Sequence, residues 1–510
     1  MSRIALLPLD ERPVNTRYPA MLARIAGAEV VLPPESAMGT GREGADRDAV
    51  ADWLRSEGPR CDGVVASAEF LAFGNLIRSR ISHESAVEGI SRLAVLEELH
   101  RGGAAVSAFG LVTRIPNAND CVEEPEYWGT YGTRLHRLSQ GLHRLGVGAG
   151  EAQDGETVRR LEGEIPAEHR SDWLTRRLRN HCLDLALLDL VARGSIDLLL
   201  LTSDDTSTWG LSTRERAWIE EWAELLNEPL AERLLVHPGA DEVGSALVVR
   251  MLAAQRGRTA RIHVTYAVPE GAEIVAPYED RPVHRTVEGQ IRACGARMVA
   301  DASDADIFLL VLPPSPRRTE FREDFADAER ADREAAYRGA FAALAHRVEA
   351  GQPVAIADVA YPNGSDPLAI ELLFAPDAPF APGALAAYGA WNTAGNTLGT
   401  TIAQAICVWL GCGDPGARQR FLTHRFLEDW GWQAVARRQV RAANTARWGR
   451  HDPDPASENE LTETLRDAQA RLATALSWLA SHRVGDGLRL AEGSVRLPWR
   501  RTFEIDFTLE

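Results

Sequence analysis

Residues 196–206, IDLLLLTSDDT, are the stretch that decides the fold. The predicted strand Leu198–Thr202 is apolar along almost its whole length, and two aspartates, Asp204 and Asp205, follow it. A strand of a parallel sheet is covered by helices on both faces, so its side chains are apolar throughout rather than at alternate positions. Residues 304–314, DADIFLLVLPP, repeat the pattern. Both stretches predict buried strands, and the first is followed directly by carboxylates.

The order of apolar run, polar turn and amphipathic stretch recurs from residue 4 to about residue 410. This order is typical of βα units around a parallel sheet. Helices are predicted at residues 214–226, 243–254 and 322–349, where apolar residues recur at spacings of three and four. The predicted strands are Ile4–Leu9, Val30–Leu32, Gly63–Ser67, Ala105–Val112, Leu198–Thr202, Leu234–His237, Ile262–Tyr266, Ile307–Leu312, Val354–Ala357 and Leu385–Trp391.

Ten strands exceed the eight of a plain barrel. We expect an α/β fold built as a (β/α)8-like barrel with insertions, because polar clusters follow many different strands rather than one crevice. The alternative is two doubly wound parallel sheets. Residues 1–412 are expected to form the catalytic domain. Residues 413–510 are expected to form a C-terminal helical appendage that ends in a short β segment.

The composition excludes several classes of function. The 510 residues carry a net charge of -17, which opposes binding to nucleic acid. Every basic residue is arginine, so Schiff-base lysines and the phosphate-binding Walker lysine are excluded. The six cysteines are scattered without a CxxC pair, which favours a reducing, cytoplasmic location. The N-terminal apolar run is too short for a signal peptide or membrane anchor, so we expect no membrane partner, and a homo-oligomer stays open.

Polar clusters follow the predicted strands, where the ligand of a parallel α/β fold is bound. Single Asp, Asn, Ser or Thr residues at such positions often cap the next helix. One such residue is enough to cap a helix, and a second carboxylate beside it adds electrostatic repulsion. Capping therefore does not explain a pair of adjacent carboxylates. The doublets are Asp10-Glu11, Asp204-Asp205 and Asp241-Glu242, and further polar candidates are Arg12, Asn75, Arg78, Asp358 and Asn363.

Paired carboxylates at strand ends suit two kinds of chemistry. One carboxyl can protonate the leaving oxygen of a glycoside while another stabilises the cationic centre. Alternatively, the carboxylates can bind a hard cation such as Mg²⁺. No HxH or HExxH pattern indicates a transition-metal site, and no GxGxxG, GxSxG or P-loop follows a strand. His237 alone is more often a core residue than a ligand.

Residues 389–400, GAWNTAGNTLGT, favour a sugar ligand. Asn392 and Asn396 supply donors and acceptors for hydroxyl or N-acetyl groups, and Trp391 supplies a flat apolar face for a pyranose ring. The structural alternative is a glycine-rich turn beside a core tryptophan.

Four motifs taken in order resemble the bacterial domain-of-unknown-function family 4127: LPLDERPVN (7–15), GADEVG (239–244), DVAYPNGSD (358–366) and GAWNTAGNTLGT (389–400). This resemblance covers nearly the whole chain and implies no activity. HPGADEV (237–243) resembles the Asp-Glu motif of the family 20 β-hexosaminidases, which implies an acetamide-orienting Asp241 and an acid/base Glu242. LLLLTSDDT (198–206) resembles the Asp-Asp motif of the family 84 N-acetylglucosaminidases. The two motifs cannot both supply the catalytic pair in the same sense.

The sequence therefore predicts a retaining glycoside hydrolase without a metal or other cofactor, acting on a small-molecule or oligosaccharide substrate. Cleavage of N-acetyl-β-hexosaminides would use the acetamido oxygen of the substrate as nucleophile, with Glu242 as acid/base. Asp204 and Asp205 would bind hydroxyls or complete the charge arrangement. Two alternatives stay open: a Mg²⁺- or Mn²⁺-dependent hydrolase of phosphate or amide bonds with Asp10, Asp204, Asp205 and Asp241 as ligands, and a non-catalytic carbohydrate-binding protein.

Overall fold

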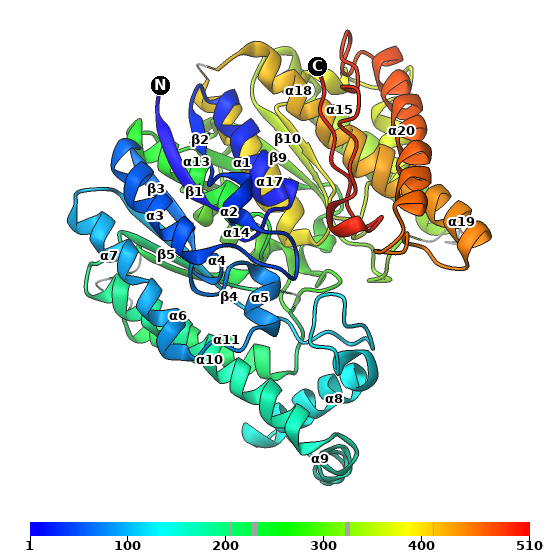
Figure 1. Ribbon diagram of the computed structural model, residues 1–510. Coiled ribbons are helices and arrows are strands. Elements are labelled where there is room, and N and C mark those ends of the chain that lie inside the picture. The colour runs from blue at the N-terminus through cyan, green and yellow to red at the C-terminus, as the bar shows by residue number, and fades with distance from the viewer. Residues whose placement is uncertain (205, 227–229, 231, 322–326, 412) are drawn as a thin grey trace. The chain divides into compact units, whose positions relative to one another are not determined.

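The computed structural model describes residues 1–204, 206–226, 230, 232–321, 327–411 and 413–510. Its contacts divide the chain into two units, each containing one all-parallel sheet (Figure 1). The first unit consists of Met1–Glu11, Glu29–Val248 and Tyr278–Asp280. The second consists of Arg12–Ala28, Val249–Pro277 and Arg281–Glu510.

The sheet of the first unit has six strands in the order β2-β1-β3-β4-β5-β6. The chain leaves β1 toward β2 on one side and then returns to β3 on the other, so the winding reverses between β1 and β3. This is the strand order of a doubly wound sheet, whose ligands bind at the carboxyl edge. The strands are β1 (Arg3–Leu7), β2 (Glu29–Val31), β3 (Gly63–Ser67), β4 (Val106–Val112), β5 (Leu198–Ser203) and β6 (Leu234–Pro238).

The sheet of the second unit repeats this order over five strands, β11-β10-β9-β7-β8. Here β7 takes the place of β1, because β8 pairs with it on one side and β9 on the other. The winding therefore reverses between β7 and β9. The strands are β7 (Arg261–Tyr266), β8 (Arg297–Val299), β9 (Ile307–Leu312), β10 (Val354–Asp358) and β11 (Ala387–Gly389).

The predicted α/β class and parallel pairing are confirmed, and all ten predicted strands are present. The sequence missed only β8, a strand of three residues that carries no buried apolar run. The barrel that we expected first is not found among the described strands. They form two sheets, with β2 and β6 at the edges of one and β11 and β8 at the edges of the other. That arrangement matches the alternative of two doubly wound sheets, because a sheet with edge strands is not closed on itself.

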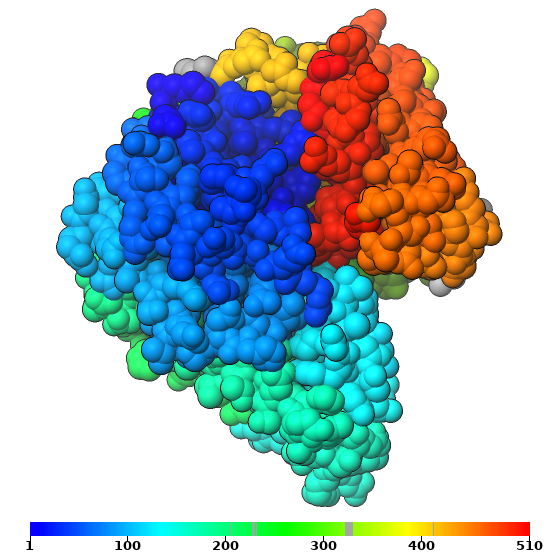
Figure 2. All heavy atoms as spheres, viewed as in Figure 1, coloured from blue at the N-terminus to red at the C-terminus, as the bar shows by residue number. Residues whose placement is uncertain are grey.

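The helices of the first unit include a small second core. Helices α8 and α9 lie at one end of the unit (Figure 1), and their side chains form a projecting lobe in the space-filling view (Figure 2). Trp128, Leu135, Leu161 and Trp173 form a hydrophobic cluster there. The helices are α2 (Glu35–Met38), α3 (Arg47–Glu57), α4 (Ala68–Phe73), α5 (Leu76–Ile81), α6 (Ala86–Arg92), α7 (Ala94–Arg101), α8 (Trp128–Gly146), α9 (Ala152–Glu164), α10 (Ala167–Ala192) and α11 (Leu211–Leu225). Helix α13 (Val243–Gln255) begins in this unit.

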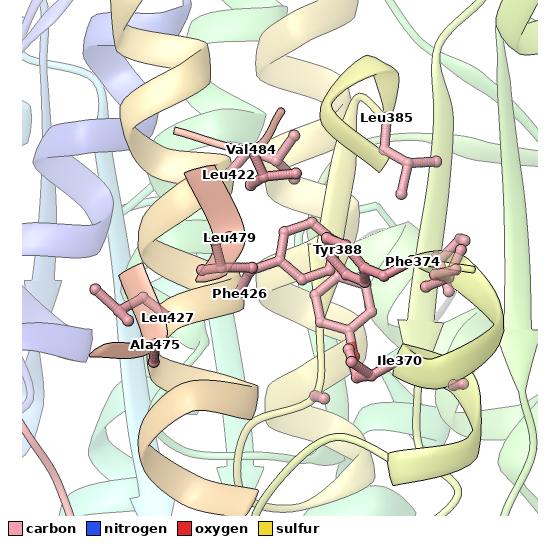
Figure 3. Close-up of a cluster of buried hydrophobic side chains, with 14 of the residues drawn as sticks. Ile370, Phe374, Leu385, Tyr388, Leu422, Phe426, Leu427, Ala475, Leu479 and Val484 are labelled. Carbon is pink, nitrogen blue, oxygen red and sulfur yellow. The ribbon is translucent and has the colours of Figure 1, made fainter. Parts of the chain in front are cut away.

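The second unit has a core in which helices from the last hundred residues pack on the sheet. Tyr388 of β11 stacks on Phe426 with ring centroids 4.2 Å apart, and Leu427 and Leu479 belong to the same cluster (Figure 3). The helices are α1 (Pro13–Ile25), α14 (Val283–Ala293), α15 (Asp327–Glu349), α16 (Pro367–Leu373), α17 (Ala394–Leu410), α18 (Pro415–Phe426), a π-helix η5 (Leu427–Ala436), α19 (Arg437–Trp448) and α20 (Glu458–Ser481).

Residues 413–510 are largely helical, as the sequence predicts, and they fall within the second unit. Their end makes isolated antiparallel bridges between Leu490 and Leu509 and between Arg496 and Asp506. The expected domain boundary at residue 412 stays a prediction.

Candidate functional site

The strands β4, β5 and β6 end at the same level of the first sheet. In the registers of the two ladders Val112 lies opposite Ser203, and Ser203 lies opposite Pro238. The backbone continues this alignment one residue further, since the N–H of Asp204 donates to the Val112 carbonyl and the N–H of Gly239 donates to the Ser203 carbonyl. The loops that follow the three strands therefore start side by side.

Two of the three predicted acidic doublets follow neighbouring strands. Asp204 comes directly after β5, and Asp241 and Glu242 follow β6 by three and four residues. Asp205 lies outside the described residues. The ends of β5 and β6 are neighbours in the sheet, one strand spacing of about 4.8 Å apart, and a cleft common to the two doublets stays a prediction.

Asp204 is held by a buried arginine. Arg80, at the end of α5, places Nη2 2.5 Å from Oδ2 of Asp204 and Nη1 2.7 Å from Oε2 of Glu123. Arg80 is only 5% exposed. A charged hydrogen bond of this kind is strongest away from water. The loops after β4 and β5 are therefore joined by one guanidinium.

Sequence reasoning missed the second part of this cluster. Glu123 and Glu124 lie in the loop after β4, where Arg114 donates to Glu123 at 2.9 Å. Burial raises the pKa of Glu124 to about 7, while Arg80 and Arg114 act in the opposite direction. The available signal was a further acidic doublet, Glu123-Glu124, which begins eleven residues beyond Val112, the end of its strand. A search restricted to the first residues after each strand does not reach it.

Glu242 is fully buried at the start of α13. Its Oε2 accepts a hydrogen bond from the backbone N–H of Ala240 at 3.0 Å. Gly239 has a φ of 149°, and a Cβ there would lie 1.9 Å from Oε1 of Glu242. Glycine at this position therefore allows the carboxyl group to fold back on its own turn. Asp241 is 5% exposed.

The residues after β1 and β3 flank the point at which the winding of the first sheet reverses. Asp10 is fully buried, and Glu11 accepts a hydrogen bond from the N–H of Gly41 at 2.6 Å. Asn75 donates to the carbonyl of the same Gly41 at 2.8 Å and caps α5 by accepting from the N–H of Arg78. Glu11 and Asn75 therefore hold the glycine-rich loop around residue 41.

Arg78 and Arg12 both contact carboxylates of the protein. Arg78 lies 3.7 Å from Glu84. Arg12 belongs to the second unit, where it forms a buried ion pair with Glu504 at 3.0 Å and lies over the ring of Trp499. The sequence names both arginines as polar candidates for the substrate site.

Asp358 is the last residue of β10 and is buried. Its oxygens accept from the backbone N–H groups of Asp366 at 2.7 Å and Ala360 at 3.2 Å. Burial, with the neighbouring charge of Asp366, raises the pKa of Asp358 to about 7. Asp366 in turn caps α16, the local role that the sequence allowed for it.

The predicted sugar-binding loop of the second unit is mostly buried. Trp391 is 1% exposed, and its ring lies 6.4 Å from that of Phe503. Its face is therefore not open to a pyranose ring, as the core-tryptophan interpretation predicts. Asn396 is buried in the first turn of α17, where its N–H donates to Oγ1 of the capping Thr393.

Asn392 and Asn363 are the half-buried members of this region. Both have left-handed backbone, with φ of 62° and 60°, a conformation that Asn tolerates better than most residues. The N–H of Asn363 donates to the carbonyl of Asn392 at 3.0 Å, and its side chain donates to Glu320. The loops after β10 and β11 are tied together in this way.

Two hollows of the described residues bear on the candidate sites. One of about 20 Å³ lies in the first unit beside Arg80 and Glu124. The other, of about 470 Å³, lies in the second unit between α15 and the strands β7 and β9, and most of its wall is alanine and other apolar side chains. Within the described ranges, no three His, Cys, Asp or Glu side chains are grouped so as to hold a metal ion.

Comparison with known proteins gives one match. The model of the family described as "Protein of unknown function (DUF4127)" matches residues 4–508. The chain belongs to this family. No curated protein and no solved structure matches the chain. None of its described helices is both long enough and apolar enough to cross a membrane.

Proposed function

We propose that this DUF4127 protein is a glycoside hydrolase whose acidic site lies at the carboxyl edge of β4, β5 and β6. The observation that supports the proposal most strongly is the register of these strands. It starts the loops of Asp204 and of the Asp241-Glu242 doublet side by side. Glycoside cleavage needs one carboxyl group that gives a proton and another that stays ionised.

The surroundings of these carboxyl groups suit different roles. Asp204 is paired with the Arg80 guanidinium, which stabilises its negative charge. Glu242 is fully buried, and removal from water favours the neutral form of a carboxyl group. In the proposed reaction Glu242 protonates the departing oxygen as the glycosidic bond breaks.

We assign the reaction to N-acetyl-β-hexosaminides with retention of configuration. The acetamido oxygen of the substrate forms the new bond to the anomeric carbon, and Asp241 orients and stabilises the acetamide. Water then opens the resulting ring, giving its proton to Glu242. Trp391 is buried, so the proposal gives it no part in stacking on the sugar.

The test is turnover of aryl glycosides with and without a 2-acetamido group by the whole chain. We expect cleavage of the N-acetylated substrates, a loss of about 10²–10⁴-fold in Glu242→Gln, and no change in Glu221→Gln, whose side chain is exposed on α11. Activity should persist in EDTA. Activity that disappears in EDTA and returns with Mg²⁺ or Mn²⁺ would favour the metal-dependent hydrolase, and binding of sugars without turnover would favour the carbohydrate-binding protein.

A further inference from the structure

The small cavity of the first unit lies beside the Arg80–Asp204 pair. Arg80, Glu124 and Trp128 are among the side chains that line it. Its volume of about 20 Å³ is roughly the room that one water molecule needs. Pockets that bind a whole small molecule are usually several hundred Å³. A sugar ring therefore does not enter, and Glu124 can affect a substrate only through its neighbours.

Three buried polar atoms on this wall have no hydrogen-bond partner among the described residues: Oε1 of Glu124, Nε of Arg80 and Nε1 of Trp128. The three residues are 6%, 5% and 2% exposed. Buried polar atoms are nearly always hydrogen-bonded. The cavity is therefore a polar site, large enough for one bridging water, and not a packing defect.

The charges closest to Glu124 come from three loops or helix ends. Its Oε1 lies 3.7 Å from Nη1 of Arg80 and 3.9 Å from Nε of Arg114. Those two guanidiniums already bond Glu123 and Asp204 at 2.5 to 2.9 Å. Among the described residues Glu124 is thus a third carboxyl group beside two guanidiniums, and a negative charge away from water is costly.

The two arginines of α10 in the cavity wall pair with carboxylates other than Glu124. Arg176 bonds Asp172 at 2.5 Å, and Arg177 bonds Glu215 at 2.5 Å. Both also donate to backbone carbonyl groups. They neutralise their own carboxylates, so the balance around Glu124 depends on Arg80 and Arg114.

We propose that Glu124 is a positioning residue that acts on Asp204 through Arg80. While Glu124 is neutral, Arg80 is bonded by Asp204 and Glu123 alone. When Glu124 releases its proton to solvent, its carboxylate competes for the same guanidinium and adds a negative charge next to Asp204. The expected effect of Glu124 on turnover rests on the proposed glycosidase activity. The electrostatic coupling between Glu124 and Asp204 does not depend on that activity.

The kinetic test compares the pH dependence of kcat/KM in the wild type, Glu124→Gln and Glu123→Gln. Burial raises the pKa of Glu124 to about 7, so the wild type should lose activity as the pH rises through that value. Glu124→Gln, which is neutral at every pH, should move the alkaline limb upward by about one pH unit or more. Glu123→Gln removes a charge that raises the pKa of Glu124, so it should move the limb to lower pH, opposite to Glu124→Gln. An unchanged limb in Glu124→Gln would overturn the proposal.

A second measurement needs no substrate. Denaturant midpoints are recorded from pH 5 to pH 8 for the wild type, Glu124→Gln, Asp204→Asn and the double variant. The midpoint of the wild type should fall relative to Glu124→Gln as the pH rises, and this difference should shrink in the Asp204→Asn background. Parallel curves, or a difference that Asp204→Asn leaves intact, would refute the coupling.

Two further outcomes are also decisive. If Glu124→Gln does not fold, Glu124→Asp serves in its place, because aspartate keeps an ionisable group. The pH at which the denaturant midpoint falls should then differ between Glu124→Asp and the wild type. An unchanged pH would count against Glu124. If the wild type cleaves no glycoside, the proposed function fails, while the denaturation series still decides whether Glu124 and Asp204 are coupled.

Discussion

Nη2 of Arg80 lies 2.5 Å from Oδ2 of Asp204, and both side chains are largely buried. Arg80 follows β3 in the chain and Asp204 follows β5, so the pair joins two strand ends that are separated in the sheet by β4. Few water molecules can reach these side chains, so water cannot solvate either charge well when its partner is removed. The pair therefore matters both for stability and for the charge of the candidate site.

Arg80→Ala should lower the free energy of unfolding by about 3–5 kcal/mol, because it removes the guanidinium that pairs with the largely buried Asp204 carboxylate. Arg55→Ala is the control, since Arg55 pairs with Glu98 at the surface with both side chains nearly half exposed. That change should cost less than about 1 kcal/mol. Urea denaturation at pH 7 measures both. Equal, small losses would mean that water reaches the Arg80 cluster.

Glu242→Gln should preserve the fold, because the amide is nearly isosteric with the acid. If Glu242 protonates the leaving group, the variant should be slowed most on substrates with poor leaving groups and less on activated aryl glycosides. Asp241→Asn should slow both kinds, since orientation of the acetamide matters whatever departs. Single-turnover rates of the bond-breaking step give the comparison. Equal losses for good and poor leaving groups in Glu242→Gln would exclude its acid role.

Gly239→Ala should destabilise the fold and displace Glu242. The added Cβ would lie 1.9 Å from Oε1 of Glu242, and the φ of 149° is itself unfavourable for alanine. Strained backbone of this kind costs on the order of 1–3 kcal/mol. Gly148→Ala isolates the backbone cost, because φ there is 73° and nothing lies within 4 Å of the new Cβ. Thermal unfolding and turnover should both fall more in Gly239→Ala than in Gly148→Ala.

Glu69→Gln should change how stability depends on pH. Burial raises the pKa of Glu69 from 4.5 to about 7, against hydrogen bonds that lower it. The folded chain therefore holds a proton that the unfolded chain has lost between these two values. This stabilisation is complete below pH 4.5 and is lost as the pH rises to about 7.

Glutamine keeps the acceptor for the N–H of Leu111 and carries no charge. Compared with the wild type, the variant should be about equally stable at pH 4.5 and more stable by up to about 3 kcal/mol above pH 7. Denaturant midpoints across this range measure the difference, with Glu221→Gln as the exposed control. A constant offset between the two curves would show that Glu69 does not titrate in this window.

The sequence by itself determined the α/β class and ten of the parallel strands, and it allowed single Asp, Asn, Ser or Thr residues after strands as helix caps. These features depend on short-range physics: a strand covered on both faces must be apolar throughout, and a free helix N-terminus needs a nearby acceptor. The sequence also placed Asp204 directly after one strand and Glu242 in the loop that follows the next. Each of these signals is contained within a few consecutive residues.

Only the tertiary structure decided how the strands divide and which charges meet. Strand order is set by crossovers between distant segments, so one alternating pattern fits both a barrel and two sheets of order 2-1-3-4-5. Arg80 lies 124 residues before Asp204, and the sequence around neither residue predicts that the two side chains pair. The burial of Trp391 could not be predicted either. Its local sequence fits both a ring that faces a sugar and a ring that lies in the core, where the structure places it. Long-range pairing and removal from water are properties of the packed chain. Burial raises the pKa of Glu124, and the ion pair with Arg80 holds the side chain of Asp204.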